Sequence, residues 1–188
     1  MKISKYLTIS FVIIAFVLGI GAGYLIAPEY AMASSESEQM ADLGKADNYV
    51  DLGYIKAMIA HHGGAMTLAE QTKAKSERPE IIKLSEEILA GEPKAIAELY
   101  QWKKDWYRDV RKVEYKEVPN IGDYDVNFDL RFLNALIAHH EEGVEMAQEI
   151  KLKSTRPEIL NNADAVIEFL NGGLEMLKDW RTRWYIEK

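Results

Sequence analysis

The sequence predicts an all-α protein, a four-helix bundle built from two tandem helical hairpins and preceded by one N-terminal transmembrane helix. Three observations predict this fold: an uncharged stretch near the N-terminus, a unit of 57 residues that occurs twice, and apolar residues that recur three and four positions apart within each unit. Spacing of three and four places side chains on one face of an α-helix, which can pack into a bundle core.

The N-terminal stretch predicts a membrane anchor. Residues 6–28 are 23 consecutive residues without a charge, and Lys2 and Lys5 precede them. About 20 apolar residues suffice to cross a bilayer as a helix, and flanking lysines favour a cytoplasmic N-terminus. We therefore expect residues 1–33 to anchor a single-pass protein in the cell membrane, with its C-terminal domain outside.

A cleaved signal peptide is the alternative to this anchor. Ala31-Met32-Ala33 followed by Ser34 fits the small-x-small pattern of a cleavage site. Cleavage near Ala33 would leave a secreted or periplasmic protein. Residues 34–48 are polar and are predicted to form a tether in the anchored form.

The rest of the chain consists of one unit in two copies. Residues 51–107 align with residues 129–185 at an offset of 78 without gaps, and 19 of the 57 positions are identical. Gapless agreement over this length indicates a tandem duplication, so both copies should have the same fold. We assign residues 49–107 to the first hairpin repeat, 108–126 to a connector and 127–188 to the second hairpin repeat.

Each repeat should contain two helices. An inward-facing stripe in the first helix of each repeat comprises Leu52, Ile55, Ile59, His62, Met66 and Ala69, and Leu130, Leu133, Ile137, His140, Val144 and Ala147. These helices are expected to end near Lys75 and Lys153. Pro79 and Pro157 then suit the first turn of the second helices, whereas Pro93 lies inside one of them and should kink it.

Composition excludes several classes of function. The chain has 23 basic and 30 acidic residues, a net charge of −7, which argues against a nucleic-acid partner. It has no cysteine, which excludes disulfides, thiolate zinc or copper sites and iron–sulfur clusters. The expected partners are the membrane, a metal ion bound through histidine, methionine or carboxylate, and a second copy of the chain or an envelope protein.

The histidines are the strongest functional signal. All four occur as two adjacent pairs, His61-His62 and His139-His140, at matching positions on the apolar side of their helices. A buried imidazole needs partners for its ring nitrogens, so burying four without a purpose would be unfavourable. The pairs predict a metal site, and the alternative is a buried hydrogen-bond network without metal.

Neighbouring residues favour copper as the metal. Met58, His62 and Met66 are four residues apart, which stacks thioether, imidazole and thioether along one helix face. Imidazole and thioether together suit Cu(I), and imidazole also suits Cu(II). Leucine and valine replace both methionines in the second repeat, where the nearby candidate ligands are Glu142 and Met146. Another divalent metal is the alternative.

Three further acidic residues are candidates for a supporting role. Glu92 falls on an inward stripe, where it would ligate metal, orient a histidine or lie in water at the end of the bundle. Asp51 and Asp129 match each other near the helix starts. They are predicted to cap their helices or to orient a histidine.

Residues 58–66, Met-Ile-Ala-His-His-Gly-Gly-Ala-Met, resemble the Met-Ile-x-His-His-x-x-Ala signature of the bacterial family known as domain of unknown function 305. A weaker copy occupies residues 136–140, and the resemblance spans about residues 49–185. It implies a ferritin-like four-helix bundle of a commonly exported family in which some members bind copper. By resemblance, the best copper ligands are His61, His62, Met58 and Met66. Relatives tend to carry Gln in the region of Glu92 and Pro93, which is a departure.

The leading interpretation is therefore a membrane-tethered, extracytoplasmic protein that binds copper for sequestration or delivery. The alternative is a structural or partner-binding bundle whose buried histidines bind no metal. A ferritin-like metal oxidase is the third interpretation, but that chemistry uses Glu-x-x-His motifs. Methionine, leucine and isoleucine stand three residues before the four histidines, so we expect no enzyme.

Overall fold

The computed structural model describes residues 49–187. Its four helices are α2 (Val50–Lys73), α3 (Pro79–Tyr107), α4 (Phe128–Lys153) and α5 (Pro157–Tyr185), and this part of the chain contains no strand. The predicted all-α, four-helix architecture is confirmed. The predicted anchor and tether lie outside the described residues, and none of the four helices is long and apolar enough to span a bilayer.

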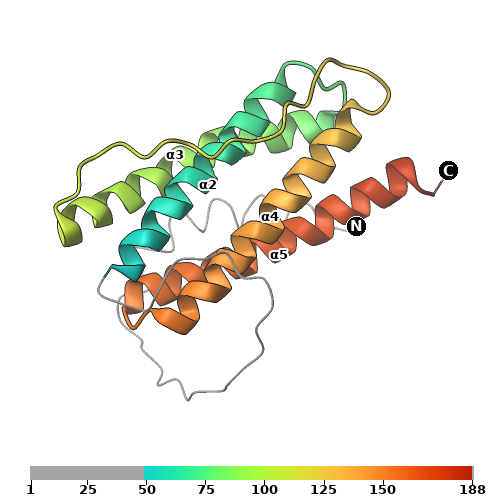
Figure 1. Ribbon diagram of the computed structural model, residues 1–188. Coiled ribbons are helices and arrows are strands. Elements are labelled where there is room, and N and C mark those ends of the chain that lie inside the picture. Colours follow the sequence, from blue (N-terminus) through green and yellow to red (C-terminus); the bar gives the residue numbers. More distant parts are fainter. Residues whose placement is uncertain (1–48, 188) are drawn as a thin grey trace, which may run out of the picture.

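Each repeat forms a helical hairpin, α2 with α3 and α4 with α5, and the hairpins meet through α2 and α4 (Figure 1). Pro79 and Pro157 begin α3 and α5, as predicted, and an extended arginine precedes each. Proline suits this position because the first amide of a helix has no acceptor within it. Helix α3 continues on both sides of Pro93.

Two clusters of buried apolar side chains lie on either side of the histidine pairs. In α2, Met58 lies before the histidines and belongs to the first cluster, whereas Leu68 lies after them and belongs to the second. On α4 the order is reversed, because Leu136 belongs to the second cluster and Met146 to the first. The two helices therefore cross antiparallel, and the histidines lie in the middle of the bundle.

Matching contacts at both ends tie the hairpins together. Arg78 Nε lies 3.2 Å from a carboxylate oxygen of Asp129, and its guanidinium is 4.5 Å from the ring centroid of Trp184. Arg156 Nε lies 3.3 Å from Asp51, and its guanidinium is 4.2 Å from the corresponding tryptophan of α3. Each repeat thus supplies an aspartate and a tryptophan to the arginine of the other, as in a two-fold symmetric interface.

These contacts give the two aspartates a role that differs from the predicted ones. The N-cap residues of α2 and α4 are Tyr49 and Asn127, so Asp51 and Asp129 lie in the first helical turn and do not cap. Their ion-pair partners are arginines of the opposite repeat and not histidines. A negative charge in the first turn also interacts favourably with the helix dipole.

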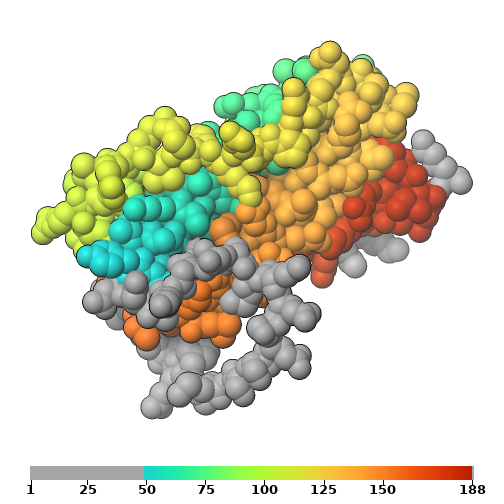
Figure 2. All heavy atoms as spheres, viewed as in Figure 1, coloured from blue at the N-terminus to red at the C-terminus, as the bar shows by residue number. Residues whose placement is uncertain are grey.

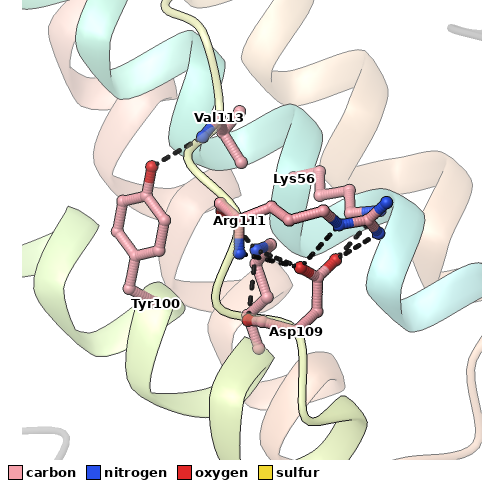
Figure 3. Close-up of polar contacts among 6 residues, drawn as sticks. Lys56, Tyr100, Asp109, Arg111 and Val113 are labelled. Carbon is pink, nitrogen blue, oxygen red and sulfur yellow. Dashed lines mark hydrogen bonds and ion pairs between the residues drawn. The ribbon is translucent and has the colours of Figure 1, made fainter.

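The connector between the hairpins is fixed at its beginning. Asp109 accepts hydrogen bonds from Arg111 at 2.7–3.0 Å (Figure 3). It also lies 3.0 Å from the ammonium of the fully buried Lys103. Lys103 also donates to the carbonyl oxygens of Asp109 and Arg111. The hydrogen bonds from Arg111, followed by those from Lys103, hold the pKa of Asp109 well below its usual range.

The connector then runs over the surface along α2 (Figure 2). The Lys116 N–H donates to the Ala60 carbonyl oxygen at 2.9 Å. Further along, Gln71 accepts a hydrogen bond from the Ile121 N–H at 2.8 Å. A backbone carbonyl and a side chain of α2 thus accept hydrogen bonds from the connector, which holds the connector beside the histidine-bearing part of the helix.

Candidate metal centre

The crossing of α2 and α4 brings one histidine of each repeat face to face. The rings of His61 and His139 stack with centroids 3.7 Å apart and an interplanar angle of 13°. His61 Nε2 lies 2.8 Å from the carbonyl oxygen of His139. Because a carbonyl only accepts hydrogen bonds, Nε2 carries the proton and Nδ1 keeps a lone pair. Hydrogen bonds of this kind orient imidazoles that bind metals.

Glycines make room for these rings. A Cβ atom added at Gly143 would lie 2.8 Å from His61 Cε1, and one added at Gly173 would lie 2.6 Å from His140 Nε2. Real Cβ atoms essentially never approach heavy atoms this closely, so a larger residue would displace the imidazole. The glycines of α4 and α5 are therefore part of what positions the histidines.

All four histidines line one cavity of about 140 Å³ between the helices. Met58 lines the same cavity, whose wall is completed by apolar side chains such as Ile88 and Phe169. Met66 and Met146 instead pack in the apolar cluster that includes Met58, and they do not line the cavity. The fold thus gathers the histidine pairs of both repeats into one cavity.

Two carboxylates contact this histidine cluster. Glu142 has a carboxylate oxygen within 4.8 Å of ring nitrogens of both His61 and His139, and it forms an ion pair with Lys116 of the connector. Glu92 pairs with His62 Nδ1 from the middle of α3. Its side chain is only 17% exposed, so Glu92 does not lie in water at the end of the bundle.

Burial keeps three of the imidazoles neutral. It lowers the pKa of His61 and His140 to about 4 each, and that of His139 to about 2, with the neighbouring histidines adding to the last shift. Metal ions bind the neutral imidazole, so these rings are ready to ligate at neutral pH. His139 Nε2 is buried and has no hydrogen-bond partner among residues 49–187, and the same holds for His140 Nδ1.

This set of donors fits a copper ion. Neutral imidazoles and one thioether in an apolar cavity are the ligands that Cu(I) prefers, and imidazole also accepts Cu(II). His61 and His139 would hold the ion, with His62, His140 and Met58 as the further candidates on the same cavity wall. In the described part of the chain, Glu142 is the carboxylate that lies close enough to His61 and His139 to share a metal ion with them. Di-iron sites of ferritin-like bundles use several carboxylates instead.

Comparison with known proteins identifies the family. The family model described as "Domain of unknown function (DUF305)" matches residues 51–123 and again residues 116–181. The chain belongs to this family. The sequence resemblance noted above is thereby confirmed for both repeats of this DUF305 protein.

Solved structures of a protein named CopM have the same fold as this DUF305 chain. "CopM in the Cu(I)-bound form" and "CopM in the Ag-bound form (by co-crystallization)" are each 30% identical, with a TM-score of 0.64, and cover 72% of this chain and 97% of their own. "CopM in the Cu(II)-bound form" is 30% identical, with a TM-score of 0.63, and covers 98% of its own chain. No curated protein matches the sequence.

Sequence reasoning missed three residues at this centre of the DUF305 fold. Lys116 lies in the connector, whose path no periodic pattern indicates. Gly143 and Gly173 face the histidines across helix–helix contacts. The sequence carried a signal for both, since each lies inside a long predicted helix, where glycine is unfavourable without a packing reason.

The two adjacent glycines of α5 provide a matched test of this packing. Gly173→Ala should lower the free energy of unfolding by about 1–3 kcal/mol, because its Cβ would overlap the buried His140 ring. A Cβ at Gly172 would have no atom within 4 Å. Gly172→Ala should therefore raise the free energy of unfolding by about 0.5–1 kcal/mol through helix propensity. Urea denaturation measures both variants, and equal effects would contradict the placement of His140.

The lowered pKa values predict that acid destabilises the metal-free protein. The unfolded histidines have a pKa of about 6.5, so above that pH neither state is protonated and stability is fully present. Below about pH 6.5 the unfolded state binds protons that buried His61, His139 and His140 do not, and stability falls as pH decreases towards about 4.

Urea denaturation with a chelator present should show this loss of stability. His139→Gln should make the free energy of unfolding depend less steeply on pH, by the contribution of about one proton taken up on unfolding. Asp109, whose pKa is also lowered, affects stability only below the pKa of an unfolded aspartate. Stability that is constant between about pH 6.5 and pH 5 would mean that the rings are not buried in neutral form.

Proposed function

We propose that this DUF305 protein is a membrane-tethered, extracytoplasmic copper-binding protein that sequesters or delivers copper by reversible ligation. The observation that carries the proposal is that all four histidines and Met58 line one cavity. Copper- and silver-bound structures of the similar protein CopM support this choice of metal.

The chemistry of the cavity favours Cu(I) over harder ions. Three of the imidazoles are neutral at pH 7, and the thioether of Met58 is a soft ligand that suits Cu(I). The two nearby carboxylates, Glu92 and Glu142, are each engaged with a side chain that carries or can carry a positive charge. The ion would therefore meet mainly nitrogen and sulfur donors.

The cavity also suits reversible binding. The side chain of His62 retains 14% exposure, whereas His61 and His139 are buried. An ion would thus meet a partly exposed imidazole before the buried stacked pair. A partly exposed ligand next to buried ligands allows an ion to move between them by successive ligand exchange, as storage or delivery requires.

A Cu(I) binding measurement on the purified domain without residues 1–33 tests the proposal. It is made under anaerobic conditions, in competition with a chromogenic chelator. We expect about one or two copper ions per chain. The double variant His61→Gln with His139→Gln should weaken the tighter site on the order of a hundred-fold, because both repeats contribute to it. Absence of binding to the native chain would reject the proposal.

The methionines supply a matched control for this measurement. Met58→Leu should weaken Cu(I) binding on the order of ten-fold, since it removes the thioether that lines the cavity. Met66→Leu should leave the affinity unchanged, because Met66 lies outside the cavity lining. Leucine occupies the position equivalent to Met58 in the second repeat, so this side chain suits the fold. Equal effects of the two variants would exclude Met58 as a ligand.

The membrane tether rests on residues 6–28, which carry no charge. In membranes from expressing cells, the chain should resist extraction by alkaline carbonate and keep its full mass, because a helix of about 20 apolar residues stays in the bilayer. A soluble chain that begins at Ser34 would instead support cleavage after Ala33.

A further inference from the structure

Among residues 49–187, the carboxylate grouped with the stacked histidines already has a cation beside it. Glu142 belongs to the group formed with His61 and His139, and its Oε1 pairs with the Lys116 ammonium. A Cβ added at Gly64 would lie 3.3 Å from His139 Cε1 and 3.4 Å from Lys116 Cβ, so Lys116 and His139 both pack beside this glycine. Lys116 therefore acts electrostatically on the place where an ion would bind.

Lys116 is held in this position by the fold. Its own backbone N–H donates to the Ala60 carbonyl, next to His61 in α2. A Cβ added at the neighbouring Gly63 would lie 2.1 Å from the Tyr115 ring, so α2 and the connector pack tightly there. The contacts of Asp109 and Ile121 fix the connector before and after this point. The backbone of Lys116 is thus fixed beside the histidine centre, within reach of Glu142.

We propose that Lys116 is a specificity-determining residue that disfavours divalent cations at the histidine centre. This inference rests on the proposed function, because it concerns the same site. Coulomb energy is proportional to the product of the charges, so the ammonium repels a divalent ion twice as strongly as Cu(I). It also neutralises Glu142, the hard oxygen ligand that a divalent ion would gain most from.

The pair itself is easily opened. The side chains of Lys116 and Glu142 are 38% and 34% exposed, and ion pairs at such positions contribute little to stability. A bound ion can therefore displace the contact without unfolding the connector. Removing the lysine charge should accordingly alter ion preference while leaving the fold intact.

The test compares Zn(II) and Cu(I) affinities of the native chain with those of Lys116→Met. We expect the variant to bind Zn(II) on the order of ten-fold more tightly, and to change its Cu(I) affinity less than about three-fold. Lys116→Arg keeps the charge and should retain the native preference. Combining Lys116→Met with Glu142→Gln should remove the gain in Zn(II) affinity, because the freed carboxylate is then missing.

Lys112→Met is the matched control, since Lys112 lies in the same connector and pairs with the exposed Glu114. It should change neither affinity. Unchanged Zn(II) affinity in Lys116→Met, or equal changes for both ions, would overturn the inference while Cu(I) binding by the native chain still upheld the proposed function. Failure of the native chain to bind Cu(I) would instead overturn the proposed function itself.

Discussion

The antiparallel crossing of α2 and α4 is the contact on which the rest of the structure depends. At this point the His61 ring stacks on His139 and donates to the carbonyl of the opposite repeat. Gly143 allows this approach, since a Cβ there would overlap His61. Neither hairpin contains the centre alone, because each contributes two of the four imidazoles that line the cavity. Docking of the hairpins and assembly of the centre are therefore one event.

Burial of these rings couples ligand binding to stability. A buried polar atom without a partner costs about 1–3 kcal/mol, and His139 Nε2 is such an atom among the described residues. An ion that binds this nitrogen would satisfy it and would also stabilise the folded state by mass action. The apolar surroundings that make the metal-free centre unfavourable also keep the imidazoles neutral and ready to ligate. An ion bound at this position would therefore stabilise the part of the fold that is least favourable without it.

Sequence periodicity could predict the helices but not what lies between them. The spacing of three and four, with Pro79 and Pro157, locates α3 and α5 because both depend on local geometry. The contacts of Asp51 and Asp129 could not be predicted, since they depend on how one repeat docks on the other. Lys116 was missed for a related reason: hydrogen bonds to α2, and not an apolar pattern, set the path of the connector. The histidines were recognised because burial of polar rings at duplicated core positions is unfavourable without a function.

Duplication allows one centre to be surrounded by unlike side chains. The two repeats share a symmetric frame, in which Arg78 and Arg156 make matching contacts with the opposite repeat. Within that frame the residues around the histidines differ, since Met58 corresponds to Leu136 and Gly64 to Glu142. Because the crossing brings both copies to one place, the thioether of one repeat and the carboxylate of the other both lie near the same histidines without being repeated in the second copy. Leu136, the counterpart of Met58, packs in the apolar core and also lines the cavity.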